Sequence, residues 1–320
     1  MPRYSIVDAH CDTVGFFCQE DSDYDFLTRS NQHHIDLPRL KESGIILQFF
    51  ALYITDEYKP TGSLAYCLRL LDSYYRTMER CPDDLQTIYS ATDLNNTLSN
   101  SKVAALLSVE GGEALEGELA VLRMLFRLGI RALGLTWNQQ NQLATGIGED
   151  KPKEGLTAFG KQVIREMNSL GMLVDLAHIN WQGYFDALKI SSDPVIVSHA
   201  NARAICKHPR NLADDQLRAL RDIDGVIGMS CCPDFVDSTH PSIDKLLDHF
   251  VHVAEVAGVD HLGIGADFDG IQDVITGLED VTGLPRLAEG LSKRGFSREE
   301  IDKITHKNMI RVLKKVLPIT

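Results

Sequence analysis

The sequence predicts a (β/α)8 barrel, in which eight parallel strands alternate with helices. Three observations lead to this prediction. Short apolar runs bounded by turn signals recur eight times along the chain, as buried parallel strands do. Many of the segments between these runs place apolar residues three and four positions apart, which is the period of an amphipathic helix. The length of 320 residues suits such a barrel, because the fold takes about 250 residues plus insertions.

The eight apolar runs are predicted to form the strands. In order along the chain, they are residues 4–9, 44–54, 103–110, 130–137, 172–178, 194–200, 225–231 and 261–269. Each run is nearly continuous in apolar residues, so helices are expected to cover the outside of the sheet. The alternative fold is a doubly wound open sheet, because its strands and helices also alternate.

Helical periodicity is clearest in five of the connecting segments. These are residues 64–80, 119–129, 155–171, 243–258 and 298–317. Residues 16–36 and 145–153 are predicted to be excursions above the barrel. No internal repeat, low-complexity tract or Pro/Ser-rich linker divides the chain, so a single domain over residues 1–320 is predicted.

Composition and charge narrow the class of protein. The hydrophobic content of 44% and the charged content of 24% are those of a soluble globular protein. The formal charge of -13 argues against a nucleic acid or an anionic membrane as partner, since both would repel the chain. We recognise neither a secretory signal nor a membrane-spanning run, and the seven cysteines include no CxxC pair. A cytoplasmic location is therefore expected.

Side chains that can bind metal lie at the ends of five predicted strands. They are His10, Asp12, Glu110, His178, His199 and Asp267. The active site of such a barrel is built at the C-terminal ends of its strands, so these side chains are expected to converge. A single histidine or HxD pair is more often structural. A metal-binding side chain at the end of each of five predicted strands, however, favours a shared metal centre.

The ligand types indicate which metal the centre binds. The two-residue period of a strand sends His10 and Asp12 to one face and Cys11 to the other. Imidazole and carboxylate groups suit zinc or a similar divalent ion. Three histidines and two carboxylates exceed the three protein ligands of one catalytic zinc. We therefore predict two divalent metal ions per chain, with zinc as the expected metal and Glu110 as the natural bridge between them.

Four motifs resemble those of the membrane dipeptidase (renal dipeptidase) family, peptidase family M19, whose members are peptidases on an amidohydrolase-type barrel. They are DAHCDT, SVEGGEAL, VSHANARAICKHPRNL and GIGADFDG, and the resemblance extends from about Ile6 to Lys315. It implies a zinc-dependent dipeptidase that tolerates a D-residue on the C-terminal side of the dipeptide, and a homodimer.

The family resemblance also implies a role for each site residue. His10 and Asp12 match the ligands of one zinc, and His178 and His199 those of the second. Glu110 matches the carboxylate that bridges the two ions.

Three further residues match positions outside the metal ligands. Asp267 matches the catalytic acid/base, and Arg210 matches the arginine that holds the C-terminal carboxylate of the substrate. From the sequence alone, Arg210 could equally be an exposed residue of a proline-containing loop. Trp137 departs from the family pattern, because it replaces a histidine that acts at the scissile carbonyl oxygen. Its indole N–H can donate a hydrogen bond but cannot carry a charge.

The departure at Trp137 keeps two other functions open. One is a barrel enzyme that hydrolyses another amide, a lactone or an ester, or that deaminates its substrate. The other is a non-catalytic metal-binding barrel, although the presence of all five ligands and Asp267 argues against it.

Overall fold

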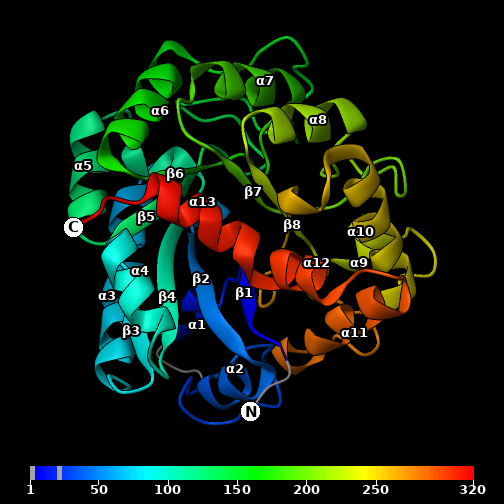
Figure 1. Cartoon of the computed structure of the whole chain (residues 1–320). Helices are drawn as coiled ribbons and strands as arrows, with labels where there is room; N and C mark the ends of the chain where they lie inside the picture. Colours follow the sequence, from blue (N-terminus) through cyan, green and yellow to red (C-terminus); the bar gives the residue numbers. More distant parts are fainter. Residues whose placement is uncertain (1–3, 20–23) are drawn as a thin grey trace.

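The computed structural model describes residues 4–19 and 24–320, and a closed parallel β-barrel lies at its centre (Figure 1). Eight strands form the barrel, namely β1 (Ile6–Asp8), β2 (Ile45–Tyr53), β4 (Val103–Glu110), β5 (Ile130–Gly134), β6 (Leu173–Asp175), β7 (Ile196–Ala200), β8 (Val226–Met229) and β9 (Leu262–Ile264). Each predicted run contains one of them. The ring closes because β2 pairs with both β1 and β4. The predicted (β/α)8 barrel is confirmed, and the open-sheet alternative is wrong.

One further strand was not predicted. β3 (Leu85–Thr87) pairs in parallel with the first residues of β4, with Leu85 opposite Val103. It lies in the connection between β2 and β4 and extends the sheet beside the barrel. With only three residues, of which the middle one is exposed, β3 has too few apolar positions to produce a sequence signal.

Helices surround the barrel in Figure 1. They are α1 (Val14–Phe17), α2 (Leu37–Ser43), α3 (Ser63–Glu79), α4 (Ala91–Leu98), α5 (Leu119–Arg127), α6 (Ala158–Leu170), α7 (Trp181–Ile190), α8 (Asp214–Asp222), α9 (Pro233–Val236), α10 (Ile243–Ala257), α11 (Pro285–Lys293), α12 (Arg298–Asp302) and α13 (Asn308–Val316). Short helical turns are η1 (Asp56–Tyr58), η2 (Gly112–Leu115), η3 (Val259–His261), η4 (Val281–Gly283) and the π-helical η5 (Lys303–Lys307). None of the described helices is both long and apolar enough to cross a membrane.

The predicted helix over residues 298–317 is divided by the π-helical turn η5. Such a turn holds more residues than an α-helical turn and therefore shifts the faces of the helix. Just beyond it, the side-chain amide of Asn308 donates to the carbonyl oxygens of Val259 at 2.7 Å and Leu262 at 2.8 Å. The break thus coincides with the point where the C-terminal helix is tied to the start of β9.

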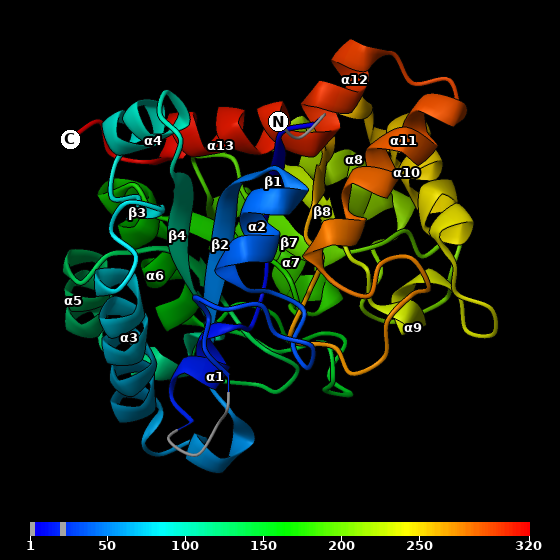
Figure 2. The same cartoon turned by 90° about the horizontal axis from the view of Figure 1, so that it is seen from below.

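Two hydrophobic layers hold the barrel together. The larger one fills the space between the strands and the outer helices, with Phe50 and Tyr74 among its bulkiest side chains. The smaller one fills the barrel interior, where Leu47 and Leu106 belong to the same cluster as Met309 of α13. In Figure 2, α13 lies on one side of the barrel and α1 lies on the other. Helix α13 therefore closes the N-terminal end and leaves the C-terminal end for the site.

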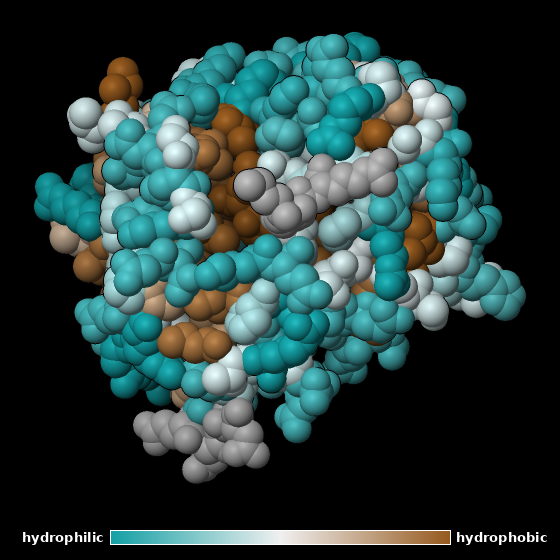
Figure 3. Space-filling model, turned by 60° about the horizontal axis from the view of Figure 1, so that its bottom comes forward, coloured by the Kyte–Doolittle hydropathy of each residue, from teal (hydrophilic) through white to brown (hydrophobic). Residues whose placement is uncertain are grey.

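The outer surface is mainly polar. On the face shown in Figure 3, hydrophilic residues cover most of the surface and hydrophobic ones form separate patches. This is the distribution expected when the amphipathic helices turn their apolar sides toward the strands. The predicted excursion 16–36 lies partly outside the described residues. The loop 145–153 reaches the end of β6, where the backbone N–H of Ile147 donates to the carbonyl of His178 at 2.7 Å.

Two glycines allow a close backbone approach near the C-terminal ends of β7, β8 and β9. A Cβ atom on Gly228 would lie 2.1 Å from the carbonyl oxygen of Ser198, and one on Gly265 would lie only 1.7 Å from it. Real Cβ atoms do not approach backbone oxygens this closely, so neither position accepts a side chain without displacing a strand.

We expect Gly265→Ala to lower the free energy of unfolding by about 3 kcal/mol, because the added methyl group overpacks the barrel. Gly15→Ala is the matched control: a Cβ there meets nothing within 4 Å, and alanine favours helix by about 0.5–1 kcal/mol over glycine. Urea unfolding of both variants measures the difference. Equal unfolding midpoints for the two variants would contradict the close approach.

Candidate active site

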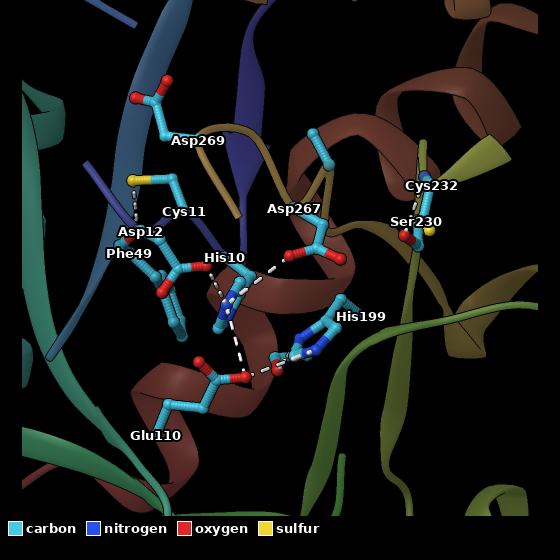
Figure 4. Close-up of polar contacts among 12 residues, drawn as sticks. His10, Cys11, Asp12, Phe49, Glu110, His199, Ser230, Cys232, Asp267 and Asp269 are labelled. Carbon is cyan, nitrogen blue, oxygen red and sulfur yellow. Dashed lines mark hydrogen bonds and ion pairs between the residues drawn. The ribbon is translucent and has the colours of Figure 1, made fainter. Parts of the chain in front are cut away.

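The predicted metal ligands converge at the C-terminal end of the barrel. Glu110 is the last residue of β4 and His199 lies in β7, whereas His10 and His178 follow the ends of β1 and β6. Figure 4 shows His10, Glu110 and His199 pointing toward one another from separate strands. All four side chains are buried. The folded chain therefore brings together residues that are up to 189 positions apart in the sequence.

Glu110 lies at the middle of this cluster. Its Oε1 atom is 2.9 Å from Nε2 of His178 and 3.6 Å from Nε2 of His199. On the other side, the same oxygen is 3.8 Å from Nε2 of His10, which is in turn 3.3 Å from Oδ2 of Asp12. One carboxylate thus stands between two pairs of further ligands.

The residues present fit a centre of divalent cations. Glu110 groups with His178 and His199 on one side and with His10 and Asp12 on the other, and in each group the ligand atoms lie within 4.8 Å of one another. Nε2 of His10 and Oδ1 of Asp12 are buried without a hydrogen-bond partner in the described part of the chain. Buried polar atoms of this kind need a partner, and a metal ion would supply it.

The pKa values of the metal-free cluster are shifted in opposite directions. Burial tends to lower the pKa of His10, but the charges of Glu110 and Asp12 raise it to about 10. Burial and the repulsion by Asp12 raise the pKa of Glu110 well above its usual value. Burial and nearby positive charges lower the pKa of His178 and His199 well below the usual value. Because the pKa values of His10 and Glu110 are raised, a divalent cation would compete with protons for these two ligands.

A shell of polar residues orients these ligands. Nδ1 of His178 is 2.8 Å from the side-chain oxygen of Asn138, and Nδ1 of His199 is 2.9 Å from the hydroxyl of Ser198. Hydrogen bonds at Nδ1 leave Nε2 free to face the centre. The sequence analysis missed both partners. Their only signal is their position, because Ser198 precedes a predicted ligand and Asn138 follows Trp137.

Cys11 turns away from the cluster, as the strand period predicts. Its thiol donates to the carbonyl oxygen of Phe49 at 3.2 Å, and Figure 4 shows it on the far side of the strand from His10. The residue is fully buried, and burial raises the pKa of the thiol well above its ordinary value. Cys11 is therefore an inert packing residue.

Asp267 also faces the cluster, with Oδ1 at 3.9 Å from Nε2 of His10. Its backbone has a φ of 68°, and that of Asp269 a φ of 66°, in the left-handed region that strains most residues. Asp269 holds this loop in place, because its carboxylate accepts from the Thr13 hydroxyl at 2.6 Å and from the His34 backbone N–H at 2.7 Å. Backbone strain of this kind clusters at functional sites.

Arg210 is buried rather than exposed on a loop. Only 7% of the residue is accessible to solvent, and one guanidinium nitrogen donates to the carbonyl oxygen of His199 at 3.1 Å. The guanidinium carbon lies 5.4 Å from the centre of the Phe235 ring. Its Nε atom has no hydrogen-bond partner among the described residues. The alternative of an exposed surface arginine is therefore wrong.

The cluster opens into a cavity of about 440 Å³. Its walls include Asp12, Glu110, His178, His199, Asp267, Arg210, Trp137, Tyr53, Cys232 and Phe235. The Trp137 ring centre lies 5.8 Å from that of His178 and 5.3 Å from that of Tyr53. Trp137 therefore forms part of the cavity wall beside His178, and every predicted site residue except His10 lines this space.

Comparison with known proteins agrees with this geometry. Residues 1–319 match the family model described as membrane dipeptidase (peptidase family M19). Dipeptidase tcpJ of Claviceps purpurea is 33% identical over 300 residues, which cover 90% of this chain and 71% of that relative.

Two solved structures are similar over nearly their whole length. The dipeptidase AC, a metallopeptidase of family M19, is 27% identical with a TM-score of 0.91, covering 98% of this chain and 99% of its own. A metallopeptidase of Rhodobacter sphaeroides, solved with a phosphinate mimic of the dipeptide L-Ala-D-Ala, is 26% identical with a TM-score of 0.90 and the same coverage. The chain described here therefore belongs to the membrane dipeptidase family, peptidase family M19, and is a metallo-dipeptidase.

Proposed function

We propose that the protein is a binuclear zinc dipeptidase that cleaves dipeptides with an L- or a D-residue at the C-terminal position. The observation that carries this proposal is the position of the Glu110 carboxylate between two pairs of buried ligands. His10 and Asp12 would hold one ion and His178 and His199 the other, with Glu110 shared. The absence of thiolate ligands and the abundance of imidazole favour zinc.

The metals and the protein divide the chemistry between them. Two bound ions would polarise the peptide carbonyl and lower the pKa of the attacking water. Asp267 would accept the proton of that water and deliver it to the departing amine. In the metal-free protein, burial raises the pKa of Asp267 to about 7, which is suited to a group that first accepts and then donates a proton at neutral pH.

Arg210 would bind the C-terminal carboxylate of the substrate. Its buried guanidinium has an unpartnered Nε and lines the metal cavity, and guanidinium groups bind carboxylates by charge-assisted hydrogen bonds. A carboxylate at this place limits the substrate to one residue beyond the scissile bond. The complex of the Rhodobacter sphaeroides relative with an L-Ala-D-Ala mimic supports tolerance of a D-residue there.

Trp137 would contact the substrate beside His178. Its ring lines the cavity close to His178, so its indole N–H is a candidate donor to the scissile carbonyl. A homodimer, a cytoplasmic location and the absence of a nucleic-acid partner stay predictions of the sequence.

The first prediction concerns the metal. We expect about two zinc ions per chain, because Glu110 serves two groups of ligands. Removing them with a chelator should abolish hydrolysis and lower the melting temperature, since a ligand that binds only the folded state stabilises it. Added zinc should restore both. Elemental analysis and thermal unfolding measure these effects, and full activity in metal-free protein would contradict the proposal.

The second prediction concerns the proton carrier. Asp267→Asn should lower kcat by about 10²- to 10⁴-fold, because an amide cannot carry the proton, while the zinc content stays unchanged. Asp273→Asn removes the same charge from an exposed position on the same loop and should leave kcat unaltered. Steady-state kinetics of both variants, with metal analysis, provide the test. Full activity of Asp267→Asn with metal bound would eliminate this role.

The third prediction concerns substrate length and stereochemistry. The wild-type enzyme should hydrolyse L-Ala-L-Ala and L-Ala-D-Ala but cleave L-Ala-L-Ala amide at least about tenfold less well, because the amide cannot form the charged contact with Arg210. In Arg210→Met the preference for the free carboxylate should disappear. The ratio of kcat/KM values for the free and amidated dipeptides measures this. An unchanged ratio in the variant would rule out Arg210 as the carboxylate ligand.

A further inference from the structure

A second cavity lies behind the Trp137 wall of the active site. It has a volume of about 580 Å³ and is lined by Asp56, Lys59, Pro60, Glu113, Gln139, Gln140, Asn141 and Gln142. The two cavities are adjacent, because Lys59 lines this one and its ammonium group lies 4.7 Å from the ring centre of Trp137, which lines the metal cavity. None of the metal ligands contributes to its walls.

The most unusual feature of this cavity is the carboxylate of Glu113. Only 6% of the residue is exposed, yet neither of its oxygens has a hydrogen-bond partner among the described residues. The side-chain amide of Asn141 and the backbone N–H of Glu113 itself lie near enough to lower the pKa of Glu113, but neither reaches hydrogen-bond geometry with the carboxylate. Burial is the larger effect and raises the pKa of Glu113.

The surrounding residues make room for the acceptors, but none of the described ones forms a hydrogen bond with them. Gly111 has a φ of 95°, and a Cβ there would lie 2.1 Å from an oxygen of Glu113, so the glycine makes space for the carboxylate. The side-chain oxygen of Gln139 is also buried without a partner. Three buried acceptor atoms on the wall of one cavity thus lack a donor among the described residues. Burying them unpaired costs free energy unless a ligand donates hydrogen bonds to them.

Lys59 does not pair with the acceptor atoms of Glu113 and Gln139. Its ammonium group lies 3.1 Å from the carboxylate of Asp56. The same group lies 5.0 Å from the centre of the Tyr53 ring and 4.7 Å from that of Trp137, within cation–π range. Lys59 is therefore paired with Asp56; its charge lowers the pKa of Glu113, but no ion pair joins these two residues in the described part of the chain.

The order of strands shows which end of a substrate faces this wall. Around the closed ring, β2 lies opposite β7, since three strands separate them in either direction. Arg210 follows β7, whereas Tyr53 is the last residue of β2 and Trp137 follows β5. A dipeptide whose carboxylate contacts Arg210 therefore extends its N-terminal residue toward Tyr53, whose ring centre lies 5.3 Å from that of Trp137.

We propose that the Glu113 cavity is the subsite for the side chain of the N-terminal residue, and that it selects a basic side chain. A guanidinium or ammonium group there would donate to the carboxylate of Glu113 and the amide oxygen of Gln139. An acidic side chain would be repelled, and an aliphatic one would leave the acceptors unpaired. The orientation of the substrate in this inference rests on the role proposed for Arg210.

The test compares L-Arg-L-Ala with L-citrulline-L-Ala, whose side chain has nearly the same shape but no charge. With the zinc-loaded enzyme, kcat/KM should be at least about tenfold higher for the arginine dipeptide, the size expected for a charge-assisted hydrogen bond. Glu113→Gln should bring this ratio close to one. Glu118→Gln, which removes the same charge from an exposed position five residues away, should leave the ratio as in the wild type. Thermal unfolding checks that both variants are folded.

The possible outcomes separate this inference from the proposed function. Cleavage of both dipeptides with equal kcat/KM, or a ratio that Glu113→Gln does not change, would overturn the subsite while the dipeptidase activity stands. A preference for L-Glu-L-Ala over L-Arg-L-Ala would also overturn it. If the metal-loaded enzyme cleaves none of these dipeptides, the proposed function fails and the subsite fails with it.

Discussion

The convergence of carboxylates and imidazoles in a buried space is the constraint on which this structure depends. Glu110 lies within 4 Å of three histidines, and without a cation its negative charge and that of Asp12 repel each other at close range. Such an arrangement is costly in a protein interior unless metal ions pair with it. The barrel supplies the rigidity that the arrangement needs, because the ligands are anchored by four strands of one closed sheet, β1, β4, β6 and β7.

The N-terminal end of the barrel stabilises the fold, and the C-terminal end carries the candidate site. At the N-terminal end, the interior is filled by apolar side chains and closed by α13. At the C-terminal end, the strands end in polar residues whose own hydrogen bonds fix their directions, as Asn138 does for His178. The backbone at His178 and Asp267 is in the left-handed region. Local strain of this kind occurs where it orients a functional side chain. The packed end of the barrel stabilises the fold against this strain.

The mouth of the site is electrostatically asymmetric. On the β7 side, Arg210 presents an unpaired buried donor, whereas beyond Trp137, Glu113 presents unpaired buried acceptors. A dipeptide is itself polar in this sense, with a carboxylate at one end and an amino group at the other. Opposite charges at the two ends of the mouth would therefore orient a short substrate across the metal centre before any side chain is distinguished. Trp137 lies between the metal cavity and the Glu113 cavity. Its ring therefore separates the two cavities, and its indole N–H is a candidate hydrogen-bond donor.

The sequence by itself determined the eight strands, the helices in five of the connecting segments and the residues at the strand ends. It could do so because buried parallel strands are nearly continuous in apolar residues, and because the barrel topology brings all strand ends to one face. It could not show β3, whose three residues carry too little pattern, nor the π-helical break before Asn308. Only the tertiary structure decided that Arg210 is buried, that Asn138 and Asp269 hold the site, and that Glu113 lacks a partner. Those properties depend on distances between elements that are remote along the chain, and local periodicity contains no information on such distances.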